Sequence, residues 1–162
     1  MASESPALSI EMVEFLESGV SVLIGTTDQD NRPAGARAIG LKVREDRRAI
    51  LAFVPVSTGD RTIANARTTK RAAVNFTRPV DYRSLQIKGA VLSVRDATLD
   101  ERPLLEKYVS DYAAHVELVG LPRALSEKLS YWPSVAIEVA IETMFVQTPG
   151  PSAGNPMPRG ST

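Results

Sequence analysis

The 162-residue chain contains no cysteine and a single histidine, His115. Without cysteine it can form no disulfide, no thiolate nucleophile and no zinc–thiolate site. One histidine cannot supply the several imidazole ligands of a multi-histidine metal centre. We therefore expect no metal site.

An excess of charge is also absent, because 19 basic residues balance 19 acidic ones. A surface dedicated to nucleic acid or anionic lipid would need a basic excess. No apolar run approaches the roughly 18 residues that a membrane helix requires. The first residues include four glutamates and lack the basic region of a secretory signal. We expect a soluble, cytoplasmic protein with no nucleic-acid or membrane partner.

The chain length suits one domain with one hydrophobic core. Alternation of apolar and polar residues predicts strands at 20–27, 34–43, 48–54, 71–77, 84–95 and 135–145. Apolar residues at helical spacing predict helices at 6–18, at 57–69, from Asp100 onward and at 123–130. Six strands in meander order, interrupted by short helices, predict a mainly β (α+β) fold, a six-stranded antiparallel split β-barrel.

We assign this single domain to residues 1–148. The remaining residues, 149–162, are rich in proline and glycine, a composition that disfavours helix and sheet. They are expected to form a disordered tail or an extended arm on a partner.

Two cations lie on the second predicted strand, Arg37 and Lys42. An arginine flanked by alanines suits the close approach of a planar anion. Strict alternation would place positions 37 and 42 on opposite faces. Both can serve one site only if Gly40 permits a bulge or the strand wraps the barrel edge. The alternative is two cations on a half-exposed strand.

The start of the second predicted helix has the composition of an anion site. It contains Ser57, Thr58, Gly59 and Arg61, and Asn65 follows one turn later. Amides at a helix N-terminus, hydroxyls and a cation together bind phosphate. An ordinary capped helix with Arg61 in solvent would use the same residues.

Polar side chains also share one face of strand 84–95, where Ser84, Gln86 and Lys88 alternate with apolar residues. A hydroxyl or an amide at this position can meet the polar edge of a heterocycle. The alternative is a strand face covered only by solvent.

In order and spacing, these motifs resemble those of the pyridoxamine 5′-phosphate oxidase-like, FMN-binding split barrels over residues 10–147. The strand carrying Arg37 and Lys42 is similar to the family's flavin-framing strand. Residues 57–65 are similar to its phosphate turn, although the family commonly has lysine where Arg61 stands. The C-terminal Arg-X-His of true pyridoxamine-phosphate oxidases is absent, because only Arg159 and no histidine follows Phe145.

The resemblance implies an FMN-dependent oxidoreductase with an unknown small-molecule substrate, and a homodimer with the cofactor at its interface. Arg61, Arg37 and the amides of 57–60 would hold the phosphate, while Lys42 and either Ser84 or Gln86 would meet the ring. No catalytic acid or base is assigned. The alternatives are a non-catalytic flavin-binding protein, or the same barrel with F420 or haem. Haem would require an axial ligand such as His115, and Trp132 could stack on a ring or simply cover the barrel mouth.

Overall fold

The computed structural model describes residues 7–157. Pro6, at the start of the first predicted helix, and Arg159 lie outside the described residues. Within them the strands are β1 (Ser21–Thr27), β2 (Pro33–Ala38), β3 (Leu41–Val43), β4 (Ala49–Pro55), β5 (Arg71–Thr77), β6 (Ser84–Asp96), β7 (Ser134–Ala140) and β8 (Thr143–Val146). The helices are α1 (Ile10–Leu16), α2 (Val56–Thr69), η1 (Leu99–Glu101), α3 (Arg102–Glu117) and α4 (Arg123–Ser126).

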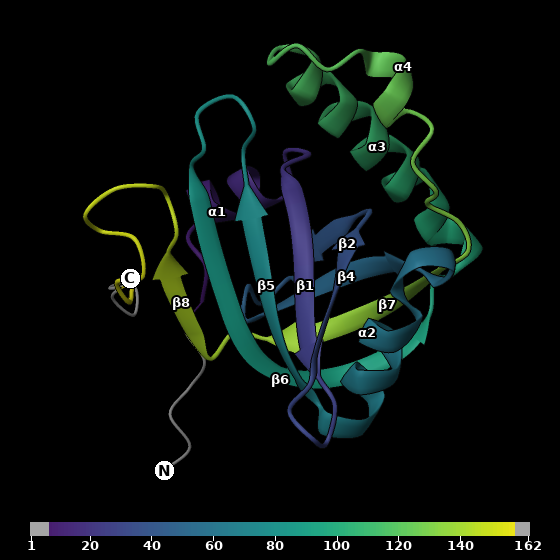
Figure 1. The fold of residues 1–162 in the computed structure, drawn as a ribbon, viewed down its shortest axis with the longest axis vertical. Helices are drawn as coiled ribbons and strands as arrows, with labels where there is room; N and C mark the ends of the chain where they lie inside the picture. Colours follow the sequence, from purple (N-terminus) through teal and green to yellow (C-terminus); the bar gives the residue numbers. More distant parts are fainter. Residues whose placement is uncertain (1–6, 158–162) are drawn as a thin grey trace.

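The strands form one antiparallel sheet in the order β2-β1-β5-β6-β7-β4-β3, with β8 also paired to β6. Strand β6 connects the two halves, because its first part pairs with β5 and β8 and its second part with β7. In Figure 1, β1, β5 and the first part of β6 run roughly vertically, and β4 and β7 cross them. The sheet is not closed, and the predicted mainly β split-barrel class is confirmed. Eight strands form where six were predicted, because two predicted strands are each broken.

The first break lies within the predicted strand 34–43. Ile39 N donates to Phe53 O at 2.7 Å, and Phe53 N donates to Gly40 O at 3.0 Å, so the chain leaves β1 and joins β4. Gly40 has φ 156°, and a Cβ there would lie 3.2 Å from the Leu105 side chain. This corner places Arg37 and Lys42 on different halves of the barrel.

The second break divides the predicted strand 135–145 into β7 and β8. Its cause is the close crossing of β6, where a Cβ on Gly89 would lie 1.6 Å from the carbonyl oxygen of Ala140. Two consecutive polar residues, Glu142 and Thr143, interrupt the alternation at this corner, and the buried position shifts from Ile141 to Met144.

The proline- and glycine-rich segment after β8 folds back along its own chain. Gly154 N donates to Val146 O at 2.7 Å, and Met157 N donates to Met144 O at 2.8 Å. Pro156 forms an isolated bridge with Phe145. Up to residue 157 the segment thus lies against β8 and is not a disordered tail, while the alternative, an arm on a partner, stays a prediction.

The helices cover the barrel at separate places. Helix α2 packs against β1 and β2, and α3 packs on the outside of β4 and β7 through Leu105, which contacts Phe53 and Ala136. Helices α3 and α4 extend beyond the upper end of the sheet in Figure 1. Among residues 7–157, no helix has the length and apolar character needed to cross a membrane.

Candidate functional site

The outward face of β2, β1, β5 and β6 carries side chains in rows set by strand register. In one row Gly35 is opposite Gly25, which is opposite Ala73 on its other side. In the next row Arg37 is opposite Leu23, Leu23 is opposite Asn75, and Asn75 is opposite Gln86. The first row therefore has almost no side chains, and the second has a cation at one end and amides at the other.

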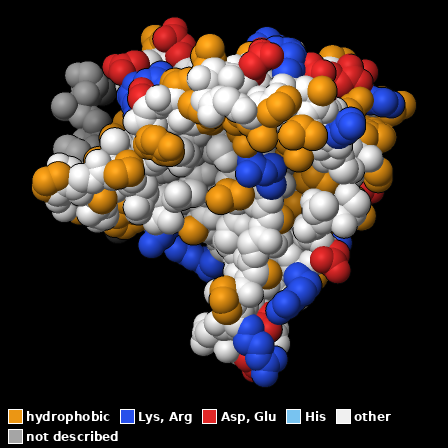
Figure 2. Space-filling view, turned by 45° about the horizontal axis from the view of Figure 1, so that its top comes forward, with side chains coloured by type: hydrophobic (Ala, Val, Ile, Leu, Met, Phe, Trp, Pro, Cys, Tyr) orange, Lys and Arg blue, Asp and Glu red, His pale blue; other side chains and the backbone are white. Residues whose placement is uncertain are grey.

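These rows form an open groove of about 560 Å³. It is lined by Leu23, Ile24, Gly25, Gly35, Ala36, Arg37, Ala73, Asn75, Gln86 and Gln147. Figure 2 shows a hollowed, mostly white area in the middle of the molecule, with hydrophobic side chains gathered above it. A floor of glycine and alanine lets a flat group approach the backbone closely. We call this surface the groove.

Three amides from separate segments gather at the β6 end of the groove: Asn75, Gln86 and Gln147. Asn75 Oδ1 is buried and has no hydrogen-bond partner among the described residues. The Gln147 backbone N donates to Ser84 O at 2.9 Å, which fixes this residue beside the end of β6. Amides can donate and accept, so this end of the groove can bind the polar edge of a heterocycle.

A second hollow of about 340 Å³ adjoins the groove at the start of α2. It is lined by Pro33, Ala34, Gly35, Thr58, Gly59, Asp60, Arg61 and Thr62, and it shares Gly35 with the groove. We call it the α2 pocket.

The backbone of the α2 pocket is arranged for an anion. Gly59 is non-helical, at φ −121° and ψ 15°, so a helical turn begins afresh at Asp60. The first amides of such a turn have no intrahelical acceptor. A Cβ on Gly59 would lie 2.2 Å from Val54 Cγ1, so only glycine fits there. Arg61 is exposed and makes no ion pair within residues 7–157, which leaves its guanidinium available. The Asp60 carboxylate also lines the pocket and opposes an anion.

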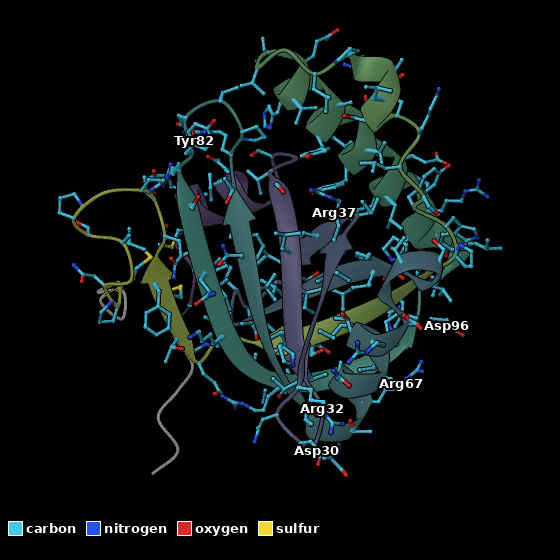
Figure 3. The ribbon with its side chains drawn as sticks, in the orientation of Figure 1. Asp30, Arg32, Arg37, Arg67, Tyr82 and Asp96 are labelled. Carbon is cyan, nitrogen blue, oxygen red and sulfur yellow. The ribbon has the colours of Figure 1, made fainter. Side chains whose placement is uncertain are left out.

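Of the predicted site residues, Thr58, Gly59 and Arg61 line the α2 pocket, and Arg37 and Gln86 line the groove. Arg37 was expected at the phosphate but does not line the α2 pocket. Figure 3 shows it at the upper end of β2. It donates through Nη1 to Ser21 Oγ at 3.0 Å, and its Cζ lies 5.2 Å from the ring centroid of Tyr112 on α3.

The structure places the other predicted residues elsewhere. Lys42 lies in hollows on the outward side of β3 and β4 and beside α3. Ser57 Oγ lies 3.2 Å from Ser130 Oγ. Asn65 is a buried residue of α2, and it lines a separate hollow beside the turn between β1 and β2. Ser84 Oγ makes hydrogen bonds at the start of β6, at 2.9 Å with Thr77 Oγ1 and at 2.8 Å to Tyr82 O.

The two residues whose role was left open also lie away from the groove. Arg102 Cζ lies 5.7 Å from the centroid of the Trp132 ring, and Trp132 packs against the cluster around Phe53. His115 Nδ1 is buried without a hydrogen-bond partner. Neither side chain lines the groove, so the described geometry gives no support to an axial ligand at His115.

Two polar groove residues, Asn75 and Gln147, were not among the predicted site residues. Asn75 shares the outward face of β5 with Arg71 and Ala73, so strand parity could have identified it. Gln147 follows β8, and its position depends on the hydrogen bond with Ser84, which no local pattern indicates.

No family model matches the sequence, and no curated protein matches it. Several solved structures share its fold. HupZ from Group A Streptococcus aligns with a TM-score of 0.57 and 12% identity over 91% of this chain and 100% of its own. A candidate pyridoxamine 5′-phosphate oxidase from Lactobacillus delbrueckii gives 0.54 and 14% over 90% and 98%. An F420 reductase gives 0.52 and 15% over 81% and 93%. The chain thus has the split-barrel fold of the pyridoxamine 5′-phosphate oxidase-like proteins, as the sequence resemblance predicted.

Proposed function

We propose that the protein binds FMN, with the phosphate in the α2 pocket and the ring in the groove. The observation that carries this proposal is the junction of the two at Gly35. A pocket at the kink of α2, with an exposed arginine that makes no ion pair among the described residues, adjoins a flat floor edged by side-chain amides. Pro33 in the pocket and Arg37 in the groove are four strand residues apart, a span of about 14 Å. A ligand that fills both is an extended molecule with an anion at one end and a planar polar ring at the other.

The phosphate-binding groups in this proposal are Arg61, the Thr58 hydroxyl and the amides that follow Gly59. Charge-assisted hydrogen bonds of this kind are short and about twice as strong as neutral ones. Arg37 is left out of this set because it lies at the other end of the groove.

The ring would lie over Gly25, Gly35 and Ala73, with its polar edge toward the amides of Asn75 and Gln86. When bound, FMN supplies hydride acceptance and onward electron transfer, and the protein orients it and excludes water from one face. We propose an oxidoreductase on this basis. The residues that line the groove include no paired acid and base, so the bound cofactor would supply the chemistry.

The groove is covered on one side only, and Leu23 on its floor is 49% exposed. The nearby β5–β6 turn exposes Tyr82, which is 64% accessible. A second copy of the chain would bury these side chains and close the groove, so we propose a homodimer with the flavin at its interface.

The test compares FMN with riboflavin, which has the same ring and no phosphate. Wild type, Arg61→Gln and the control Arg67→Gln, an exposed arginine farther along α2 that lines neither hollow, are titrated by flavin fluorescence. We expect Arg61→Gln to weaken FMN binding about 10- to 100-fold and to leave riboflavin binding unchanged. Equal wild-type affinity for the two ligands would contradict a phosphate site.

F420 is the second candidate, favoured by the F420 reductase that shares the fold. Its phosphate and planar ring meet the same two features of the site. Absorbance of the loaded protein separates FMN from haem, because bound flavin absorbs at about 450 nm and haem gives a Soret band. A non-catalytic flavin-binding protein would bind FMN but would not pass electrons from the reduced flavin to any acceptor added to it.

A further inference from the structure

Arg37 is the only charged residue among those that line the groove. Its side chain is half-buried, and its known contacts are with the neutral Ser21 hydroxyl and the Tyr112 ring. No ion pair joins it to a carboxylate in the described part of the chain. A partly desolvated guanidinium without a counterion is unfavourable, and proteins normally pair it.

Several arginines elsewhere on the barrel follow that rule. Arg78 pairs with Asp81, and Arg95 Nη2 lies 2.7 Å from the carboxylate of Glu101, the last residue of η1. Arg44 lies 2.9 Å from Glu138. These three arginines outside the groove each have a carboxylate partner, whereas half-buried Arg37 has none among the described residues.

The neighbours of Arg37 hold its guanidinium in place and leave donors free. Ser21 takes one N–H of the five that a guanidinium carries. Helix α3 is anchored just beside it, because Tyr108 donates to Val20 O at 2.5 Å and its ring stacks parallel to that of Tyr112. Burial raises the pKa of Tyr108, so this hydroxyl stays neutral and offers Arg37 no counterion.

We infer that Arg37 is the binding site for the carboxylate of a small planar substrate. Leu23, directly opposite Arg37 in the register, offers an exposed apolar surface for the body of that molecule. A carboxylate matches the two-pronged geometry of a guanidinium better than a single-point anion does. The inference rests on the proposed flavin site, because the substrate would lie beside a ring held on the glycine floor.

The cofactor phosphate does not satisfy Arg37 in this account. The α2 pocket already supplies the Arg61 cation, and its far edge at Pro33 lies about 14 Å from Arg37 along β2. The groove therefore has one positive charge left for a second ligand, which makes Arg37 a substrate-binding residue that selects acids over their neutral analogues.

The test uses benzoate and its neutral analogue benzamide, titrated into FMN-saturated protein and followed by the change in the flavin absorption band. We expect benzoate to bind at least tenfold more tightly than benzamide. Arg37→Gln should remove that preference, Arg37→Lys should keep part of it, and Arg67→Gln should leave it intact. Circular dichroism and urea unfolding establish that each variant is folded.

Two results would overturn the inference. In the first, benzoate and benzamide bind wild type alike, or benzoate does not bind. In the second, Arg37→Gln weakens FMN but not riboflavin, which would assign Arg37 to the phosphate. Failure of the proposed function looks different, because the wild type would then bind no flavin. Calorimetric titration of the flavin-free protein with benzoate would still show whether Arg37 selects a carboxylate.

Discussion

Replacing Gly25 by valine should separate ligand binding from folding. Gly25 lies on the groove floor between Gly35 and Ala73, and its neighbours Ile24 and Thr26 point into the core. A Cβ on Gly25 would lie 3.9 Å from Ala73 O, which is ordinary van der Waals contact. The new side chain would therefore fit the sheet and project into the groove.

The two effects have opposite signs. Valine favours a strand over glycine, so the free energy of unfolding should stay equal or rise by up to about 1 kcal/mol. A ring pressed against the added methyl groups should lose about 1–3 kcal/mol through overpacking. Since 1.4 kcal/mol is a factor of ten, FMN affinity should fall by about 5- to 150-fold.

The assay is a flavin fluorescence titration with a parallel urea unfolding curve. Gly25→Ala serves as the graded control, because it adds only the Cβ and should weaken binding less. Unchanged FMN affinity in a folded Gly25→Val protein would refute the placement of the ring. A large loss of stability would instead show that a side chain at position 25 clashes with the protein and does not project freely into the groove.

Two further predictions concern the fold. Gly89→Ala would place a Cβ 1.6 Å from the Ala140 carbonyl oxygen, so we expect it to lower the free energy of unfolding by about 3 kcal/mol or more; an unchanged urea midpoint would contradict the crossing of β6 and β7. The hydrogen bond from Arg95 lowers the pKa of Glu101 from its ordinary value of 4.5 to about 2. The resulting stabilisation is fully present above pH 4.5 and is lost as pH falls toward 2, so wild type should lose more stability over that window than Glu101→Gln, by less than about 1 kcal/mol because the pair is partly solvated. Parallel acid dependence of the two proteins would show that the ion pair contributes nothing.

Local patterns predicted the strands well because alternation reports which face is buried. The prediction missed both breaks, because it continued one strand across short interruptions of the alternation, Ile39-Gly40-Leu41 and Glu142-Thr143, where the pairing partner changes. Composition did not predict that residues 149–157 lie against β8, because this depends on backbone hydrogen bonds between the two segments.

The candidate site divides in the same way. Thr58, Gly59 and Arg61 were predictable from helix N-terminal chemistry, and Gln86 from strand parity, because both are local. The location of Lys42 and the hydrogen-bond partners of Ser84 could not be predicted from local sequence, because both depend on the fold. The corner at Gly40 moves Lys42 to the other half of the barrel, and Thr77 and Tyr82 occupy the Ser84 hydroxyl.

The most direct test is a crystal structure of the protein saturated with FMN. The account predicts the phosphate between the Arg61 guanidinium and the amides that follow Gly59, with the ring over Gly25 and Gly35. The Arg37 guanidinium should make no contact with the phosphate. A flavin bound outside the groove, or a phosphate bound at Arg37, would contradict the account.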